Sequence, residues 1–328
     1  MPELPEVETL KLGLRKYLVG HTIKDIEVKV PKLFVGDKRN VIGAKVVDVK
    51  RIGKGLILEL NNNYVLAVHL KMTGQLVYRD EKTKNLTLSV KVGGETLPSK
   101  YTHIIFKLKT LASRRSGQKS NLKTTRLAQA LAKRATQNSK LQDESNEAFL
   151  YYNDLRQFGW IKVVKKDKVM QVPFFKEMGP EPPVVPLSGT MEGQALLTIN
   201  KFREILQKSG LVVKVLLMDQ KKIGGIGNIY ANDALYKAGI DPRRKAKQIS
   251  SKEADKLYDA ILAVLKAGLE FGGSSDENFV NVLGEEGAYQ NHFLIYGRKS
   301  EKCKKCGSII QKIRLGGRGT YFCENCQR

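Results

Sequence analysis

Two Cys-x-x-Cys pairs near the end of the sequence restrict the fold more than any other feature. Cys303 and Cys306 form the first pair, and after sixteen intervening residues Cys323 and Cys326 form the second. Each pair can direct two thiolates at one ion, and four thiolates suit a tetrahedral zinc site; two free redox pairs are the alternative. Four protein ligands leave no position for a substrate, so we expect one zinc ion that holds structure.

Between the two pairs lies the segment IIQKIRLGGRGTYF, in which two alternating apolar arms flank a Gly-Gly turn. This pattern predicts a β-hairpin that is fixed by the zinc ion. The hairpin carries Arg314 and Arg318, which are either ordinary surface charges or contacts to a polyanion. The charge of the whole chain favours the second interpretation.

The sequence has 57 lysines and arginines against 33 aspartates and glutamates, a net charge of +24. So large an excess repels itself unless an anion neutralises it, which favours nucleic acid over a membrane surface as the partner. No apolar stretch reaches the roughly 18 residues that span a bilayer. The start, MPELPEVE, is acidic and proline-rich, unlike a secretory signal. We therefore expect a cytoplasmic protein that acts as a monomer and has no membrane partner.

The first half of the chain predicts one helix followed by a sheet. Val7, Leu10, Leu14 and Leu18 have helical spacing, and Pro5 suits the first turn of that helix. Short alternating segments follow, separated by Gly, Asn and Asp, and they predict an antiparallel sheet or sandwich. These segments are IKDIEVKV, KVVDVKRI, LILEL, YVLAVHL, HIIFKL and FLYYNDLRQFGWIKVV.

A basic segment interrupts this pattern. Residues 111–142 hold eight basic and no acidic residues, and they predict a surface insertion over 111–147 that either attracts phosphates or has no specific role. The proline-dense stretch VPFFKEMGPEPPVVPLSG predicts a linker, and the helical segments FREILQKSG, VVKVLLMD, IYANDALYKAG and KEADKLYDAILAVLKAGLEFGG follow it.

The second residue offers a reactive amine. Removal of Met1 would leave Pro2 with a free secondary amine, and an α-amine has a pKa of about 8, so roughly a tenth is neutral at pH 7. Such an amine can attack a sugar aldehyde carbon and form an iminium ion. Glu3 could supply a proton as the sugar ring opens, or Glu3 and Glu6 could simply cap the helix.

Five motifs stand in a set order: MPELPEVETL at the start, HLKMTGQL at 69–76, NDLRQFG at 153–159, LLMDQKKIGGIGNIYANDALYKAGIDP at 216–242 and the final CxxC…CxxCQ. Together they resemble the formamidopyrimidine-DNA glycosylase family, bacterial enzymes that remove 8-oxoguanine and ring-opened purines. The resemblance covers nearly the whole chain except the insertion.

The resemblance implies a bifunctional glycosylase and AP lyase that acts on damaged double-stranded DNA in base excision repair. Pro2 matches the Schiff-base nucleophile of the family and Glu3 its general acid. Lys54 matches the lysine of β-elimination, and Arg318 matches the arginine of δ-elimination and phosphate binding.

The resemblance also implies how the duplex is opened. Met72, Arg156 and Phe158 match the three residues that fill the gap left by the flipped base. An apolar wedge with hydrogen bonds to the orphaned base can offset an unstacking cost of a few kcal/mol. Met72 could instead belong to the core, and Phe158 could be a packed aromatic residue.

Further residues match contacts to DNA. Asn228 and Lys214 match contacts to phosphates and the lesion region, and Glu6 matches a lesion contact. His103 matches a histidine of a DNA-contacting strand, or it has only a structural role. The glycines of 224–227 are expected to let the backbone approach a phosphate at a helix start.

Some positions depart from the family pattern. Gln157 stands where the family often has a second arginine, and a basic DNA-contacting position near 208–210 is not cleanly matched. The segment 279–293, FVNVLGEEGAYQNHF, resembles the lesion-capping segment only in outline, and this segment sets substrate preference. An endonuclease VIII-like enzyme for oxidised pyrimidines is the alternative, and a noncatalytic zinc-finger DNA-binding protein is a third.

The predicted fold is of the α+β multidomain class. It combines an N-terminal helix and antiparallel β-sandwich, a helical domain of the helix-two-turn-helix type, and a C-terminal zinc β-hairpin. The expected divisions are a catalytic sandwich at 1–172, a linker at 173–187, the DNA-binding helical domain at 188–275, a lesion-capping loop at 276–293 and the zinc finger at 294–328.

Overall fold

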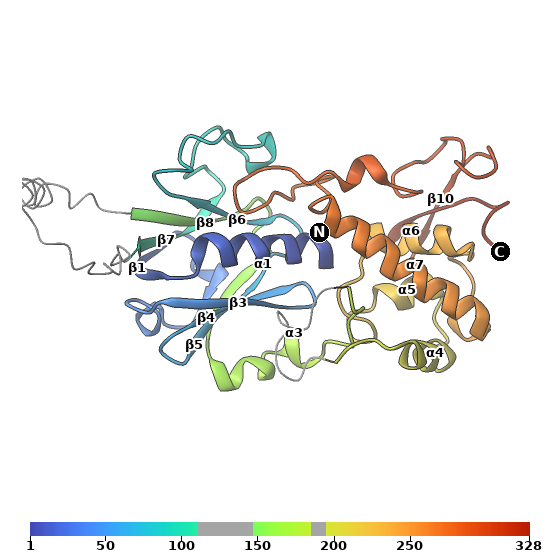
Figure 1. Ribbon diagram of the computed structural model, residues 1–328, viewed down its shortest axis with the longest axis horizontal. Helices are drawn as coiled ribbons and strands as arrows, with labels where there is room; N and C mark the ends of the chain where they lie inside the picture. Colours follow the sequence, from blue (N-terminus) through green and yellow to red (C-terminus); the bar gives the residue numbers. More distant parts are fainter. Residues whose placement is uncertain (111–146, 185–194) are drawn as a thin grey trace, which may run out of the picture.

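The computed structural model describes residues 1–110, 147–184 and 195–328. The predicted basic insertion, apart from its last residue, lies outside the described residues, as do the end of the predicted linker and the start of the helical domain. Two lobes lie side by side, with the sandwich on the left of Figure 1 and the helices and zinc hairpin on the right. The N-terminus lies in the middle, where the lobes meet (Figure 1).

Helix α1 (Leu4–Leu18) joins the two lobes. The four predicted core residues of this helix are all buried in the sandwich, which confirms the amphipathic pattern. Pro5 lies in the first turn, where a missing N–H group costs nothing. Leu4, by contrast, is buried in the core of the helical domain. The first turn of α1 therefore belongs to both domains.

Two sheets form the predicted sandwich. The first is antiparallel throughout, in the order β1 (His21–Val28), β7 (Thr102–Thr110), β8 (Glu147–Asp154) and β6 (Gly74–Arg79). The second has the order β2 (Phe34–Val35), β9 (Trp160–Lys165), β5 (Tyr64–His69), β4 (Gly55–Leu60) and β3 (Val46–Ile52). Its short β2–β9 pair is parallel, which differs from a fully antiparallel sandwich.

The segment 149–164, which is predicted as one run of the sheet or sandwich, forms two strands in different sheets. Strand β8 ends at Asp154, and β9 begins at Trp160 in the other sheet. Gln157 between them has a φ of 54°, in the left-handed region. The N–H group of Gly159 donates to Asp154 Oδ2 at 2.8 Å. This backbone turn breaks the alternation that defines a strand, and it carries the two predicted wedge residues of this segment.

The helical prediction is confirmed. The second lobe contains α4 (Ile199–Gln207), α5 (Val213–Met218), α6 (Asn228–Ala238) and α7 (Ser251–Glu270). Ser250 and Glu253 form a capping box at the start of α7, which satisfies amide groups of the first turn. None of the helices in the described part of the chain is long and apolar enough to cross a membrane.

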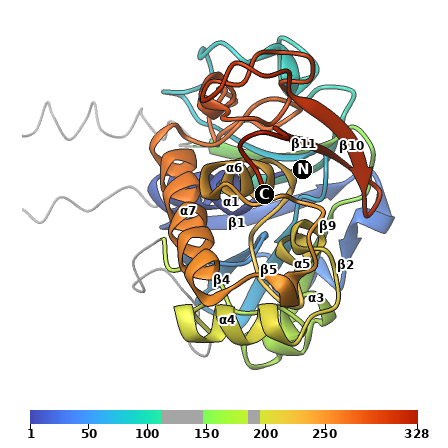
Figure 2. The ribbon, with the colours of Figure 1, turned by 90° about the vertical axis from the view of Figure 1, so that its right-hand side faces the viewer.

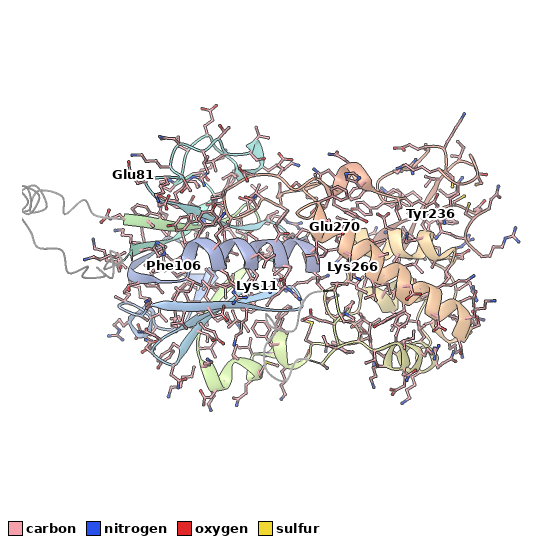
Figure 3. All side chains as sticks on the ribbon, viewed as in Figure 1. Lys11, Glu81, Phe106, Tyr236, Lys266 and Glu270 are labelled. Carbon is pink, nitrogen blue, oxygen red and sulfur yellow. The ribbon has the colours of Figure 1, made fainter. Side chains whose placement is uncertain are left out.

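The predicted hairpin is also confirmed, with β10 (Gln311–Leu315) paired to β11 (Arg318–Phe322). Gly316 and Gly317 in its turn have φ values of 53° and 76°, which glycine adopts without strain. The hairpin lies beside α6 (Figure 2). Phe106 in the sandwich core and Tyr236 in the core under the zinc module mark opposite ends of the molecule (Figure 3).

The segment predicted as a lesion-capping loop crosses back to the sandwich. Phe279 and Val282 are buried in the sandwich core, and the amide of Tyr78 donates to the oxygen of Val282 at 2.8 Å. The side chain of Gln75 donates to the oxygen of Asn278 at 2.7 Å. This segment is therefore a second bridge between the lobes, in addition to α1.

Short elements complete the linker region. A 3₁₀ turn covers Lys166–Gln171, and the four-residue helix α3 covers Pro173–Lys176. Phe175 of α3 is buried against the second sheet together with Ile57 and Val65. The start of the predicted linker is thus packed on the sandwich, whereas Gly179 and Pro180 are hydrogen-bonded to Gln220 and Gly224 of the helical domain.

Candidate active site

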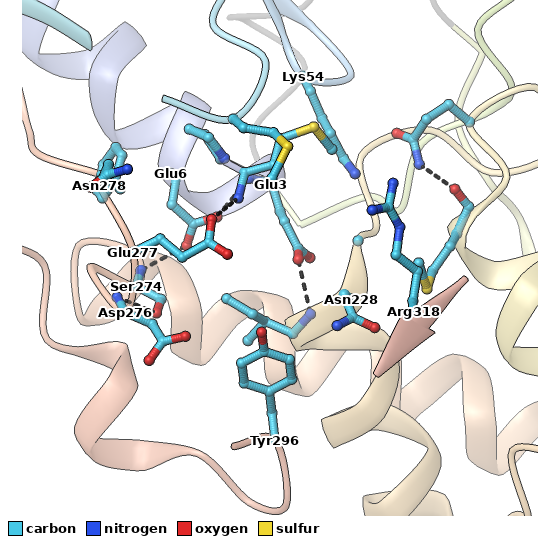
Figure 4. A pocket seen from close by; sticks show the side chains of 18 residues that line it. Glu3, Glu6, Lys54, Asn228, Ser274, Asp276, Glu277, Asn278, Tyr296 and Arg318 are labelled. Atoms are coloured by element: carbon cyan, nitrogen blue, oxygen red, sulfur yellow. Dashed lines mark hydrogen bonds and ion pairs between the residues drawn. The ribbon is translucent and has the colours of Figure 1, made fainter. Parts of the chain in front are cut away.

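A pocket of about 300 Å³ lies where the two lobes meet. Figure 4 shows side chains entering it from α1, from the loop after β3, from the start of α6, from the segment after α7 and from β11. The four predicted catalytic residues all line it, as do Glu6, Met72 and Asn228 from the predicted contacts. The lining also includes Met218, Gln220, Gly227, Ile229, Ser274, Asp276, Glu277, Asn278, Phe279 and Tyr296.

Glu3 is held at the bottom of this pocket and is only 3% exposed. Its Oε1 accepts a hydrogen bond of 2.9 Å from the amide of Ile229 in the first turn of α6, where backbone N–H groups favour a carboxylate. Its Oε2 has no hydrogen-bond partner among the described residues. Burial raises the pKa of Glu3 to about 7, although the nearby Lys54 ammonium opposes the shift. The side chain can therefore carry a proton near neutral pH.

Two glycines before α6 allow this arrangement. A Cβ atom on Gly227 would lie 2.3 Å from Glu3 Cδ, and one on Gly225 would lie 2.7 Å from a methyl group of Leu4. The amide of Leu4 also donates to the oxygen of Gly225 at 3.0 Å. The Cβ positions of both glycines thus face the first turn of α1. These glycines bring the two domains together.

Glu6 forms a buried link among three segments. Its Oε2 accepts from the amide of Glu3 at 2.8 Å, which caps α1. Its Oε1 accepts from the hydroxyl of Tyr230 and the amide of Ser274, both at 2.7 Å. Burial raises the pKa of Glu6, while these hydrogen bonds act in the opposite direction. Glu6 therefore both caps α1 and lines the pocket.

Lys54 reaches the pocket from the turn between β3 and β4. Its Nζ donates to the oxygen of Ile226 at 2.8 Å, and the side chain of Gln220 donates to the same oxygen at 2.7 Å. Burial lowers the pKa of Lys54, whereas the carboxylates of Glu3 and Glu6 raise it. A buried lysine of this kind loses its proton more readily than a surface lysine.

A buried ionic network holds the turn that carries Lys54. Arg51 Nε donates to Glu8 Oε2 at 2.8 Å, and Arg51 Nη1 donates to Glu181 Oε2 at 2.5 Å. The other oxygen of Glu181 accepts from the amide of Gly53. All these side chains are almost completely buried. The linker residue Glu181 therefore connects α1 and β3 with the lysine turn.

The three predicted wedge residues lie together, and one of them, Met72, lines the pocket. Arg156 Nη1 is 3.1 Å from the sulfur of Met72, and its guanidinium lies 4.7 Å from the ring centre of Phe158. Phe158 is 53% exposed, whereas an aromatic residue of the core would be buried. Asp154 helps to hold this cluster in place, because its Oδ1 accepts a hydrogen bond of 3.2 Å from the amide of Arg156.

The other predicted contacts occupy different environments. His103 is buried, with Nε2 2.8 Å from the backbone oxygen of Asp154, so it supports the turn that carries the wedge. Lys214 is fully buried, and its Nζ donates to the oxygen of Gly319 and to Thr320 Oγ1, both at 2.7 Å. Burial lowers the pKa of Lys214 to about 7. In the structure Lys214 thus holds the hairpin that positions Arg318.

Comparison with known proteins explains this arrangement. Models of the formamidopyrimidine-DNA glycosylase N-terminal domain, of its H2TH domain and of the zinc finger found in FPG and IleRS match residues 1–161, 190–280 and 300–328. Formamidopyrimidine-DNA glycosylases of Pelotomaculum thermopropionicum and Streptococcus mutans are 33% and 32% identical to the chain. These alignments cover all of the chain and 99% and 100% of the two relatives. The chain belongs to the formamidopyrimidine-DNA glycosylase family.

Solved structures of this family agree in fold. A Lactococcus lactis formamidopyrimidine-DNA glycosylase in complex with DNA containing N7-benzyl-Fapy-dG is 30% identical, with a TM-score of 0.75 and full coverage of both chains. The same Lactococcus lactis protein with DNA containing an abasic site is 29% identical, with a TM-score of 0.75 and 99% of each chain covered. The chain is therefore an enzyme, a DNA glycosylase of base excision repair.

The cysteine cluster of this family member fits zinc. The four Sγ atoms lie within 4.8 Å of one another, with Cys303–Cys326 at 3.8 Å and Cys306–Cys323 at 3.5 Å. Zinc–sulfur bonds of about 2.3 Å in a tetrahedron place sulfur atoms about 3.8 Å apart. Four thiolates at this spacing and the zinc-finger family match identify a structural zinc site.

Sequence reasoning missed several residues of this glycosylase site. Glu181 and Arg51 carry no motif signal, because a glutamate between prolines gives no sign of its distant partner. Asp233 is fully buried and accepts hydrogen bonds from three successive amides, 294–296, and from Tyr289. It thereby fixes the backbone of Tyr296, which lines the pocket. The sequence offers one signal for Asp233, namely an acidic residue on the face of the predicted helix that should be buried.

Proposed function

We propose that this glycosylase excises oxidised purines, 8-oxoguanine and formamidopyrimidines, from duplex DNA and then cuts the strand, with Pro2 as the nucleophile. One observation carries the proposal: Pro2 and Glu3 at the start of the chain, Lys54 between β3 and β4, and Arg318 in β11 come from three separate segments and line a single pocket. A nucleophile, a proton donor, a buried amine and a guanidinium are the groups that excision and elimination require.

The first step requires removal of Met1, which frees the secondary amine of Pro2. The amine attacks C1′ of the damaged nucleotide, so that a bond forms between the proline nitrogen and C1′ and the glycosidic bond breaks. The proton that the proline nitrogen loses neutralises the departing base. The Glu3 carboxyl group, which burial keeps protonated up to about pH 7, donates its proton to O4′ as the C1′–O4′ bond opens. The product is an iminium ion that links Pro2 to the sugar.

The iminium ion makes the C2′ protons acidic, so that eliminations follow. In the β-step a C2′ proton is lost, the C3′–O bond breaks and the 3′-phosphate leaves. Lys54 is suited to this step because burial lowers its pKa and its Nζ lies in the pocket. In the δ-step a C4′ proton is lost and the C5′–O bond breaks, and the Arg318 guanidinium is suited to stabilise the departing phosphate. A one-nucleotide gap with phosphate ends remains.

The proposed partner is damaged double-stranded DNA. The net charge of +24 provides attraction to phosphates, and Asn228 at the start of α6 lines the pocket beside Gly227. The exposed Phe158 and its neighbours Met72 and Arg156 are placed to enter the stack when the lesion is extruded. We also propose that the enzyme acts as a monomer.

The proposed division of labour follows the predicted domains. The sandwich, 1–172, supplies Pro2, Glu3, Lys54 and the wedge residues. The helical domain, 188–275, supplies phosphate contacts. The zinc finger, 294–328, supplies the fourth catalytic residue, Arg318. The linker, 173–187, and the segment 276–293 connect them. The packing of Glu181 and Phe279 on the sandwich supports a joint role for both connections in shaping the pocket.

Product analysis tests this function. Duplexes with 8-oxoguanine, a formamidopyrimidine or thymine glycol are incubated with the protein, and released bases and strand ends are identified by mass spectrometry. The proposal predicts preferential release of the two purine lesions and phosphate at both ends of the gap. Preferential release of thymine glycol would instead support the endonuclease VIII-like alternative, and intact duplex with all three lesions would refute the enzymatic proposal.

A further inference from the structure

Two acidic residues on the segment after α7 face the pocket of this polycationic protein. Asp276 and Glu277 line the pocket together with Glu3 and Glu6, so four carboxyl groups surround it. Figure 4 shows Asp276 and Glu277 on one side of the pocket and Arg318 on the other. Carboxylates in a DNA-binding pocket repel phosphate groups, so we expect Asp276 and Glu277 to bind a different group of the substrate.

Glu277 already binds an N–H donor in the structure. Its Oε2 accepts a hydrogen bond of 3.0 Å from the ammonium group of Met1. Half of the Glu277 side chain is exposed, so the carboxylate is accessible from the pocket. The proposed chemistry at Pro2 requires that Met1 be absent, and its removal leaves the place of this donor free for a substrate.

No basic side chain competes for this position. Among the described residues, no lysine or arginine forms an ion pair with Glu277 or Asp276. The nearest candidate on the opposing loop, Lys91, pairs with Glu286 at 2.8 Å and also donates to the oxygen of Ser275. The Glu277 carboxylate therefore keeps two acceptor oxygens for a group in the pocket.

We propose that Glu277 recognises the Watson–Crick edge of the extruded base and selects guanine-derived lesions over adenine-derived ones. Both 8-oxoguanine and the formamidopyrimidine of guanine present N1–H and the 2-amino group side by side, two donors for the two oxygens of a carboxylate. The formamidopyrimidine of adenine presents one amino group beside the lone pair of N1, which repels a carboxylate. This inference rests on the proposed function and specifies its substrate.

The test compares two lesions that differ in this edge, each in a duplex with its normal pairing partner. Single-turnover rates of base release are measured for formamidopyrimidine-guanine paired with cytosine and formamidopyrimidine-adenine paired with thymine. We expect the wild type to prefer the guanine lesion and Glu277→Gln to lower that preference at least about tenfold, because one carboxylate–edge pair is lost. Glu270→Gln makes the same charge change on the exposed end of α7 and should keep the wild-type ratio (Figure 3).

The outcomes separate the two proposals. An unchanged preference in Glu277→Gln, with wild type active on both lesions, would overturn the role of Glu277 and leave the proposed function standing. A wild type that releases neither base would overturn the proposed function and this inference with it. Zinc content and thermal unfolding of each variant are measured beside the rates, so that a misfolded protein is not counted as a change in specificity.

Discussion

The Lys54 ammonium donates a hydrogen bond to the backbone oxygen of Ile226 at 2.8 Å, and this bond joins the sandwich to the loop that begins α6. The two residues are far apart in the sequence and belong to different domains. The pocket therefore exists only when the domains are docked. Any change that separates these two segments should lower activity, even where it touches no reacting atom.

Gly227→Ala tests this docking. The new Cβ would lie 2.3 Å from Glu3 Cδ, so Glu3 or α6 must move. We expect a loss of about 1–3 kcal/mol in the free energy of unfolding and at least a tenfold slower base release. Gly210→Ala is the matched control, because no atom lies within 4 Å of its Cβ position. Equal rates for the two variants would contradict the importance of the close contact.

Glu181→Gln should uncouple the linker from Arg51. The substitution leaves a buried guanidinium with one carboxylate fewer, and breaking such a pair costs about 3–5 kcal/mol. Urea unfolding measures this cost. Glu177→Gln is the control from the same linker, since Glu177 forms only an exposed pair with Lys221, and it should hardly change stability. A similarly small effect of Glu181→Gln would show that the network does not support the fold.

The raised pKa of Glu3 predicts how the stability of the protein depends on pH. Burial raises its pKa from 4.5 to about 7, so the folded protein binds a proton that the unfolded chain releases between these values. The Glu3 contribution to stability is therefore lost as pH rises from about 4.5 to 7. Glu3→Gln should become more stable than wild type by about 1–3 kcal/mol across this range. A stability difference that is constant with pH would be inconsistent with a raised pKa.

The raised pKa of Glu3 should also limit the rate of base release at high pH. If Glu3 donates its proton to O4′ and Pro2 attacks as a neutral amine with a pKa of about 8, the single-turnover rate of base release should stop rising at about pH 7 and fall above about pH 8. Glu3→Gln should lose most base release at every pH. A wild-type rate that keeps rising well beyond neutral pH would argue against Glu3 as the proton donor.

Cys323→Ser should release zinc and weaken duplex binding without unfolding the sandwich. The cysteine module has its own small core, whereas Trp160, the only tryptophan of the chain, lies in β9 of the sandwich. Tryptophan fluorescence therefore reports on the sandwich, and atomic emission reports on zinc. One zinc ion per chain in the variant would refute the four-thiolate site.

Features with a regular pattern could be predicted from the sequence. The apolar spacing of α1, the positions of most strands and the Gly316–Gly317 turn each follow from local rules, and the structure confirms them. The catalytic set came from the family resemblance, and the structure brings Pro2 and Glu3 into one pocket with their predicted partners.

Features that depend on tertiary packing could not be predicted. The sequence has no sign that Glu181 pairs with Arg51, or that Lys214 points into the protein to hold the hairpin. The break between β8 and β9 at Gln157 could not be predicted either, because no sequence pattern reliably marks a non-glycine residue with a positive φ. In each case the surrounding structure decides the environment of the residue.

The most direct test of the central claim is to trap the covalent intermediate. The protein is incubated with an 8-oxoguanine duplex and borohydride, and the adduct is digested and mapped by mass spectrometry. The proposed mechanism predicts that the DNA is attached to the nitrogen of Pro2, in a chain that lacks Met1, and that Pro2→Gly diminishes the adduct. Attachment to a lysine such as Lys54, or an undiminished adduct in Pro2→Gly, would contradict Pro2 as the nucleophile.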